Sequence, residues 1–511
     1  METKPYEPPE GLPKTRDEFF EKLRIYNTES VQKVHTLRDG MFSSFDSWCD
    51  DDGAFNPALL AKDIVDNNSV KTDSISDTLY FYDEEHGFYD RNGDAKVRAL
   101  IEACLQQENR QHRTTEVTYL VHSKTLTTTT PSHKIALING LLDPKTQTLE
   151  DHTSNTFVTV KMTVRHDPKA DCPNIKKFLG EILEPDQIPI AQEMFGYCLL
   201  REYPIHKSMV LLGEGANGKS TFLNLLSTFL GSENCSHATL QQLCEGKFEL
   251  AQLFGKLANI CDDLPSEGLK SVGNFKNLTG NAPIMAQYKH KTPFDFLNTA
   301  KMLWACNKLP QASEDTIAYY RRFVILLMNK YFLDEKADIR LLDKLTTPSE
   351  LSGLLNYALE GLKRLLAQGR FSSSTTIEQT RQQYIRTADS CLAFIEETTI
   401  IDTDPDVALS DEIIYSNYVN FCRNNKLPIQ KKAQLTITMQ KTRPEAKHTV
   451  VRLDGKLTHA WKFLKLVTTV TTVTTTSPIL NFNYQIHKEI ETLVTAVTPV
   501  TNSSQEASVC Q

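Results

Sequence analysis

A glycine-rich loop between two apolar segments places the strongest limit on how this chain can fold. The stretch 208-SMVLLGEGANGKSTFLNLL-226 begins with an apolar run, breaks at three glycines and then resumes with apolar residues. The run 208–212 suits a buried strand, and the spacing of apolar residues over 220–230 is typical of a helix. The sequence therefore predicts a strand, a tight loop and a helix in direct succession.

The loop matches the pattern G-x-x-x-x-G-K-[ST], which holds nucleotide phosphates when a strand precedes it and a helix follows. Glycines let backbone N–H groups point inward, and the helix N-terminus adds partial positive charge. Lys219 would reach the β- and γ-phosphates, and the Ser220 hydroxyl would bind Mg²⁺. The residues expected to surround ATP are Gly213, Glu214, Gly215, Ala216, Asn217, Gly218, Lys219, Ser220 and Thr221. A purely structural glycine turn is the alternative.

A second apolar segment ends in two carboxylates. In 257-LANICDDLP-265 the expected strand is followed by Asp262 and Asp263. Asp262 would hold the Mg²⁺ shell, and Asp263 could orient or deprotonate an attacking water. An ordinary acidic loop after a strand is the alternative. Further strand candidates at 301–306 and 323–328 alternate with helical sequence, which predicts a parallel sheet covered on both faces.

Three classes of nucleotide-binding protein compete. A GTPase would show N-K-x-D, but 307-NKLP-310 has Pro310 where the base-binding aspartate belongs. A small-molecule kinase would need an acceptor pocket and lid, and no such feature is identifiable. A motor ATPase would place a polar sensor at the end of a strand and an arginine beyond it. Asn307 and the pair Arg321 and Arg322 fit that third pattern.

The ordered set GEGANGKST, LANICDD, NLTGNAPIMAQYKHK, KMLWACNKLP and DTIAYYRRFVIL resembles the superfamily 3 DNA helicases. In particular it is similar to the C-terminal ATPase of the phage/plasmid primase–helicases, which are related to the poxvirus primase–helicase. The resemblance covers about residues 56–370, because 56–175 is similar to the domain that precedes that ATPase. It implies an α/β fold with an AAA+-like P-loop NTPase core built on a parallel sheet.

The resemblance also implies roles for individual residues. Asp262 and Asp263 would be the Walker B pair, Asn307 the sensor of the lytic water, and Arg321 or Arg322 a finger acting on the neighbouring subunit, with Arg322 slightly favoured. Lys289, His290 and Lys291 would lie on a basic hairpin that grips single-stranded DNA. A solvated surface hairpin is the alternative for these three. A hexameric ring moving 3′ to 5′ is implied as well.

The expected organisation has five parts: an N-terminal extension (1–55), an α+β domain (56–175), the helicase ATPase (176–375), a winged-helix-like domain (376–466) and a Thr/Val-rich tail (467–511). A strand is also expected over 156–164. In the winged-helix-like domain, basic residues could meet DNA phosphates, with protein docking as the alternative. Those residues are Lys431, Lys432, Lys441, Arg443 and Lys456. A primase catalytic domain is not expected in the roughly 55 residues before 56, so a separate primase or other replication protein is an expected partner.

The composition restricts the mode of nucleic-acid binding and the cellular compartment. A net charge of -8 argues against a chain that coats nucleic acid by bulk charge. Eleven scattered cysteines without a C-x-x-C pair suit a reducing cytoplasm, and no membrane segment is expected. The sequence predicts an ATP-dependent replication helicase on single-stranded or forked DNA. An ATP-binding initiator or DNA-binding scaffold is the alternative, and a metabolic kinase is a third hypothesis.

Overall fold

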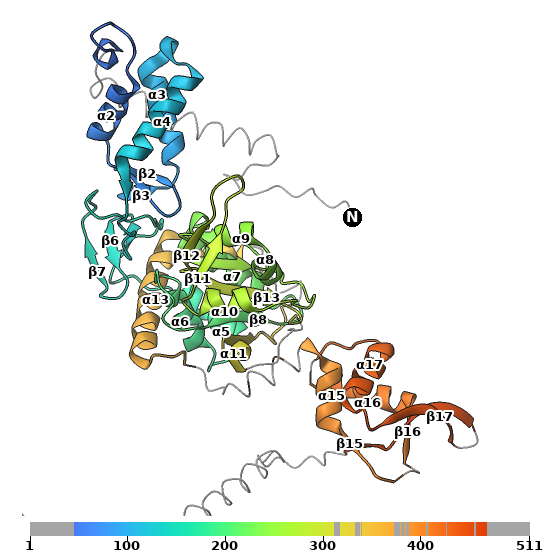
Figure 1. Ribbon diagram of the computed structural model, residues 1–511. Coiled ribbons are helices and arrows are strands. Elements are labelled where there is room, and N and C mark those ends of the chain that lie inside the picture. Colours follow the sequence, from blue (N-terminus) through green and yellow to red (C-terminus); the bar gives the residue numbers. More distant parts are fainter. Residues whose placement is uncertain are drawn as a thin grey trace, which may run out of the picture. The chain divides into compact units, whose positions relative to one another are not determined.

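The computed structural model describes residues 45–310, 317–332, 340–372, 388–404, 407–425, 427–453 and 456–467, with positions 338, 379 and 384. The chain forms two compact units. The first comprises residues up to Ser390 together with Cys422–Gln430, and the second comprises Cys391–Phe421 with the chain from Lys431 onward. Figure 1 shows the elements of each unit.

The described chain begins with a helical layer on a small sheet. Asn56 caps α2 by accepting the Ala58 N–H, and Pro57 occupies the first helical position. Helices α2, α3 and α4 enclose an apolar core that includes Leu60, Ile64 and Val97. The sheet has the order β3-β2-β1-β4. Its elements are η1 (Phe45–Trp48), α2 (Pro57–Asn67), β1 (Val70–Asp73), β2 (Leu79–Asp83), β3 (Phe88–Asp90), α3 (Gly93–Leu105), η2 (Gln106–Glu108), α4 (Gln111–Thr125) and β4 (Leu126–Thr127).

A second small sheet follows, with β5 (Ile135–Leu137), β6 (Gly140–Asp143) and β7 (Thr148–Glu150) in sequence order. The strand expected over 156–164 is not a regular strand. Its backbone instead shares hydrogen bonds between two elements: the Val158 carbonyl accepts from Tyr89, and the Val160 carbonyl accepts from Ala136. Only Lys161 forms a bridge, with Ala136. The alternation of buried residues was visible in the sequence, but the divided pairing was not.

The centre of the first unit is a five-stranded parallel sheet with the order β14-β8-β13-β10-β9. Every residue of β8, β10 and β13 is buried, which explains their continuous apolar sequence. The four strands expected from the sequence are confirmed. The strands are β8 (Ser208–Leu212), β9 (Cys235–Ser236), β10 (Ala258–Cys261), β13 (Lys301–Cys306) and β14 (Phe323–Leu327).

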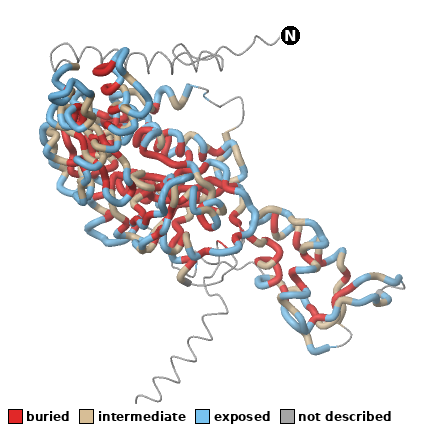
Figure 2. Tube along the Cα trace, turned by 45° about the horizontal axis from the view of Figure 1, so that its top comes forward, coloured by how far each residue is buried: buried red, intermediate tan, exposed pale blue. Residues whose placement is uncertain are grey.

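Helices cover both faces of this sheet. One apolar cluster joins Met209 and Leu211 of β8 to α5, α6, α7 and α13, and another joins Val210 and Leu212 to α8 and α10. Figure 2 shows many of the buried residues in the interior of this unit. The helices are α5 (Pro173–Ile182), α6 (Ile188–Tyr197), α7 (Lys219–Leu230), η3 (Ser232–Asn234), α8 (Leu240–Glu245), α9 (Lys247–Ala251), α10 (Gly273–Thr279), α11 (Ile317–Tyr320), α12 (Leu341–Leu345) and α13 (Pro348–Gln368).

An antiparallel hairpin projects from this layer between α10 and β13 (Figure 1). Its strands are β11 (Pro283–Ala286) and β12 (Phe294–Leu297), with Ala286 opposite Phe294. The inward residues Ile284, Phe294 and Phe296 are buried, so the hairpin is held by its base.

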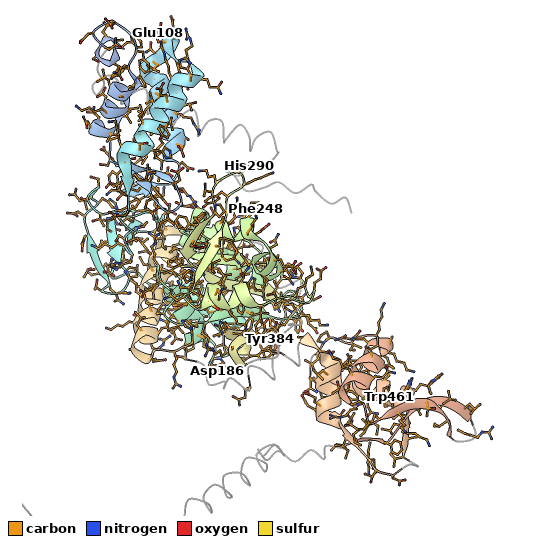
Figure 3. All side chains as sticks on the ribbon, viewed as in Figure 1. Glu108, Asp186, Phe248, His290, Tyr384 and Trp461 are labelled. Carbon is orange, nitrogen blue, oxygen red and sulfur yellow. The ribbon has the colours of Figure 1, made fainter. Side chains whose placement is uncertain are left out.

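The second unit contains two antiparallel sheets, β16-β18-β17 and β15-β19, with helices packed on them. Its core includes Phe394, Tyr418, Leu435 and Trp461. Trp461 is labelled in Figure 3. The elements are α15 (Ser390–Thr398), β15 (Thr399–Ile401), β16 (Ala408–Ser410), α16 (Asp411–Asn424), α17 (Lys432–Thr442), β17 (Lys447–Leu453), β18 (Lys456–Lys462) and β19 (Leu464–Leu466).

The expected division of the chain differs from the observed units in two ways. The regions 56–175 and 176–375 lie within one unit, and the boundary expected at 375/376 lies at 390/391. The N-terminal extension up to residue 44 and the Thr/Val-rich tail from 468 lie outside the described residues. Within the described residues, no helix is both long enough and apolar enough to cross a membrane.

Candidate functional site

Three strands of the central sheet end side by side, and the polar residues singled out in the sequence follow them. Leu212 at the end of β8 lies opposite Cys306 at the end of β13. Cys261 at the end of β10 lies opposite Trp304, two residues before the end of β13. The Gly213 N–H donates to the Cys306 carbonyl at 3.2 Å. Loops that leave β8, β10 and β13 therefore meet at one edge, the usual place for ligands in open α/β sheets.

The backbone of the loop after β8 adopts positive φ angles, which few residues other than glycine allow. Gly215 and Gly218 have φ of 108° and 86°, and Ala216 between them has a φ of 45°. Gly218 is the residue directly before α7, and a Cβ there would lie 2.7 Å from Cγ2 of Ile182. A Cβ on Gly213 would lie 2.5 Å from the Met328 carbonyl oxygen. The glycines thus serve both the turn and close packing of the backbone.

Lys219 is buried at the first position of α7, with 7% of its surface exposed. Its Nζ donates to the Gly213 carbonyl at 2.6 Å and to Oδ1 of Asn217 at 2.9 Å. Burial lowers the pKa of Lys219, while Cys306, Asp262 and Asp263 act in the opposite direction. The ammonium therefore lies within electrostatic reach of both carboxylates, which belong to another strand.

The carboxylates and the amide beside this lysine face solvent. Asp262 and Asp263 follow β10, Asn307 follows β13, and all three are exposed. Ser220 is also exposed, in the first turn of α7. Within the described residues, no group of three or more His, Cys, Asp or Glu side chains is arranged to hold a metal ion. Mg²⁺ bound with nucleotide phosphates needs only one or two protein oxygens, so these residues fit such an ion.

A segment that sequence reasoning missed crosses the same loop. Residues 328–332, which we term the strap, follow β14 and bind the loop at three points. Asn217 Nδ2 donates to the Met328 carbonyl at 2.9 Å, the Phe332 N–H donates to the Ala216 carbonyl at 2.8 Å, and the Tyr331 hydroxyl donates to Glu214 Oε2 at 3.2 Å. No local pattern in the sequence reveals these contacts, because they join residues more than a hundred positions apart.

The strap is also tied to α5. Lys330 Nζ donates to the Leu183 carbonyl at 2.8 Å, just beyond the C-terminal end of that helix. A lysine is favourable at this end because the last carbonyls lack helical partners.

The two arginines lie at the amino-terminal ends of the strands, opposite the glycine loop, and their environments differ. Arg322 is buried; its Nε donates to Thr279 Oγ1 at 2.9 Å, its Nη2 donates to the Lys276 carbonyl at 3.2 Å, and its Nη1 donates to the Ala318 carbonyl. Arg321 is exposed. Both precede β14, whose first residue lies opposite Ser208, the first residue of β8.

Positive charge gathers around Arg321. The pKa of His206 is lowered by burial and then by Arg322 and Arg321, and the pKa of Lys207 is lowered by burial and then by Arg321. This amino-terminal edge is separated from the glycine loop by the five residues of β8. At about 3.3 Å per residue, the separation is roughly 15 Å.

The expected basic residues lie together in the turn of the β11–β12 hairpin. Lys289, His290 and Lys291 are all exposed, and His290 has a φ of 65° in the turn. His290 is labelled near the tip of the hairpin in Figure 3. Tyr288 stacks on Phe294, with ring centroids 5.4 Å apart, and its hydroxyl accepts from Arg91 Nη2 at 3.2 Å. The stacked rings and the Arg91 contact hold the base of a positively charged turn.

The second unit separates its charges along the chain. Residues 431–465 contain nine lysines and arginines and two acidic residues, whereas residues 391–421 contain seven acidic residues and no basic one. On α17, Lys432 and Lys441 are exposed, together with Ile437. Lys456 is exposed at the start of β18, whereas Arg443 is half-buried and donates to the Thr399 carbonyl at 3.2 Å. The turn 454–455 lies outside the described residues.

Comparison with known proteins identifies two matching regions. Residues 62–184 match the family described as D5 N terminal like, and residues 211–322 match a family of unknown function (DUF5906). The second region begins in β8 and includes the glycine loop, both carboxylates, the hairpin and the arginines. Each match covers less than half of the chain.

A curated viral protein and several solved structures are similar as well. The "Putative helicase L207/L206" of Acanthamoeba polyphaga mimivirus is 29% identical over 174 residues, which is 32% of this chain and 18% of that protein. Two structures of the C-terminal region of NrS-1 have a TM-score of 0.43 at 11% and 12% identity, covering 80% of this chain and 99% of theirs. The chain therefore carries a D5 N terminal like region and resembles a helicase-named viral protein over about a third of its length.

Proposed function

We propose that this protein is an ATP-dependent DNA helicase that acts during replication of a phage, plasmid or integrated element. One observation carries the proposal: the glycine loop with Lys219 leaves β8 at the same end of the parallel sheet at which Asp262 and Asp263 follow β10. This is the constellation that a P-loop ATPase of the superfamily 3 kind needs. The D5 N terminal like region and the similarity to a helicase-named protein support the same function.

In this proposal the residues of the loop divide the work of holding ATP. The backbone of 213–218 and the start of α7 would bind the phosphates, and Thr221 would extend that cradle. Lys219 would exchange its contacts with Gly213 and Asn217 for the β- and γ-phosphates. Ser220 and Asp262 would hold Mg²⁺, which would neutralise charge on the phosphate oxygens.

Two other residues would position and activate the attacking water. Asp263 would orient the attacking water and accept its proton, and Asn307 would fix the position of that water. Both follow strands that flank one another, so the rigid sheet sets where the loops that carry them begin. Hydrolysis would then be sensitive to any change that shifts β13 relative to β10.

An arginine in trans would complete the site. Arg321 and Arg322 lie at the far edge of the sheet, so neither can reach the loop of its own subunit. A neighbouring subunit in a ring, for which a hexamer is proposed, would bring this edge to the phosphates. Arg321 is the better finger because it is exposed, whereas Arg322 is committed to three internal acceptors.

DNA would be held by two parts of the chain. Lys289, His290 and Lys291 would contact phosphates of single-stranded DNA without reading bases, with 3′ to 5′ movement driven by hydrolysis. The second unit would be a winged-helix-like module: its order of helix, two short strands, two helices and hairpin fits that class, and its basic stretch suits a DNA backbone. A primase in trans and a cytoplasmic setting remain part of the proposal.

Two assays test this function. ATP hydrolysis should rise on addition of single-stranded DNA, and the protein should separate a forked duplex. Lys219→Ala should abolish both activities, because no other loop residue carries a positive charge to the phosphates. Wild-type protein that does not separate strands, whether or not it hydrolyses ATP, would refute the proposal.

The second candidate is an initiator or scaffold that binds ATP only to assemble on DNA. The charge-separated second unit favours it, because a DNA-binding module does not require a motor. Hydrolysis of ATP without strand separation, combined with ATP-dependent binding to duplex DNA, would select this candidate.

A further inference from the structure

The strap offers an exposed aromatic ring beside the glycine loop. Tyr331 is 50% exposed, and its hydroxyl is fixed by Glu214 at 3.2 Å. On either side of it, Lys330 is anchored to the Leu183 carbonyl and Phe332 to the Ala216 carbonyl. The hydroxyl contact fixes the ring, and the contacts of its two neighbours fix the segment that carries it, so a half-exposed ring lies at a defined place beside the glycine loop.

The order of strands decides which end of a nucleotide meets this ring. β13 and β10, which carry Asn307 and the two aspartates, lie on one side of β8, and β14 lies on the other. A nucleotide in the loop must turn its terminal phosphate toward the carboxylates, where Mg²⁺ and water would act. Its base then points toward β14, and the strap leaves the end of β14 at this same edge because Leu327 lies opposite Leu212.

We infer that Tyr331 is the platform on which the nucleobase of the bound triphosphate stacks. The inference rests on the proposed function and adds a specificity-determining residue to it. Stacking on a tyrosine face accepts any base and favours the larger purines, so ATP and GTP would bind better than CTP and UTP. Glu214 acts as a positioning residue that keeps the ring in place.

The test measures affinity for two ligands that both carry a chain of three phosphoryl groups, of which only one carries a nucleoside. Titration calorimetry with Mg²⁺ and either AMP-PNP or inorganic tripolyphosphate would compare wild type, Tyr331→Ala and Tyr331→Phe. Tyr331→Ala should weaken AMP-PNP about tenfold and leave tripolyphosphate within about twofold, since only base stacking is removed. Tyr331→Phe keeps the ring but loses the Glu214 contact, so it should bind AMP-PNP more weakly than wild type and more tightly than Tyr331→Ala, and should bind tripolyphosphate as wild type does. Tyr119→Ala, at another exposed tyrosine, is the matched control.

Each other outcome decides a different point. Unchanged AMP-PNP affinity in Tyr331→Ala overturns the platform, and so does an equal weakening for both ligands, because the ring would then only support the loop. Lys219→Ala should bind neither ligand. If the wild-type protein binds neither ligand, both the phosphate-binding role of the glycine loop and this inference are refuted. If the wild type binds tripolyphosphate but Tyr331→Ala does not weaken AMP-PNP selectively, only the inference is refuted and the proposed function stands.

Discussion

At the scale of single residues, the adjacent arginines show how burial separates two side chains that the sequence cannot tell apart. Arg322 donates to Thr279 and to the carbonyls of Lys276 and Ala318, so it ties α10 to the turn before β14. Arg321 has the same chemistry and an exposed position. The first is placed to support the fold, and the second is available to another subunit.

This difference predicts opposite phenotypes. Arg322→Ala should destabilise the first unit by about 2–3 kcal/mol, because the buried Thr279 hydroxyl and two partly buried carbonyls would lose their charged donor. Arg321→Ala should change stability by less than about 0.5 kcal/mol and should abolish ATP hydrolysis. Thermal unfolding followed by circular dichroism, alongside a hydrolysis assay, measures both. Equal unfolding midpoints for the two variants would contradict the assignment.

Lys301, the first residue of β13, is fully buried. Its Nζ donates to the carbonyls of Leu200 and Thr299, each at 2.7 Å. It also lies 4.8 Å and 5.2 Å from the ring centroids of Tyr197 and Tyr203. A neutral amine has two N–H groups, which equals the number of carbonyl acceptors present.

Burial lowers the pKa of Lys301 to about 7, with Cys198 and Glu202 acting in the opposite direction. Its pKa in the unfolded chain is about 10.4, so between these values the unfolded state binds more protons and stability rises with pH. The slope is at most about 1.4 kcal/mol per pH unit, and it vanishes below pH 7, where both states are protonated. Cys198, Tyr197 and Tyr203 have raised pKa values and oppose the rise once thiols ionise above about pH 8.5.

Lys301→Met should therefore flatten the dependence of stability on pH between about 7 and 8.5. Chemical unfolding of wild type and variant at closely spaced pH values measures the slope. The comparison does not depend on whether the substitution itself raises or lowers stability. A variant that retains the wild-type slope would assign the dependence to other groups.

At the scale of elements, the sequence predicted the strands whose form depends on residues close to one another in the chain. The continuous apolar runs identified β8, β10, β13 and β14, because strands covered on both faces need them. Contacts between distant segments escaped prediction. The strap binds the glycine loop through partners such as Asn217 and Met328, and the extended segment 156–164 divides its hydrogen bonds between two elements. Neither pairing leaves a periodic trace in the sequence.

The β11–β12 hairpin carries its own prediction. Lys289→Ala combined with Lys291→Ala should weaken binding to single-stranded DNA and reduce the slope of log affinity against log salt by about 1.4, or about 0.7 for each phosphate that the variant no longer neutralises. Fluorescence anisotropy over a salt series measures both quantities. The control combines Lys177→Ala with Lys363→Ala, which removes the same charge from exposed positions on α5 and α13. Equal effects of the two pairs would assign binding to net charge rather than to the hairpin.

At the scale of the whole molecule, the two halves of the proposed active site lie at opposite ends of the strands of one sheet. Lys219 lies at the carboxyl edge of β8, and Arg321 lies at the amino edge of β14, roughly 15 Å away along the strands. In a head-to-tail ring, every interface can place the Arg321 end of one protomer beside the Lys219 end of the next, whereas an isolated protomer cannot bring its own two ends together. Activity should therefore belong to the assembly.

Mixing inactive variants tests this arrangement. Lys219→Ala and Arg321→Ala proteins should each be inactive, but an equal mixture should recover hydrolysis. One interface in about four would combine an intact Lys219 with an intact Arg321, if subunits exchange freely in a heterologous ring. Mixing either variant with the double variant should recover nothing, because no interface then carries both residues. A mixture that stays inactive although the subunits exchange would mean that the arginine does not act across the interface, and hydrolysis would have to be completed within one protomer.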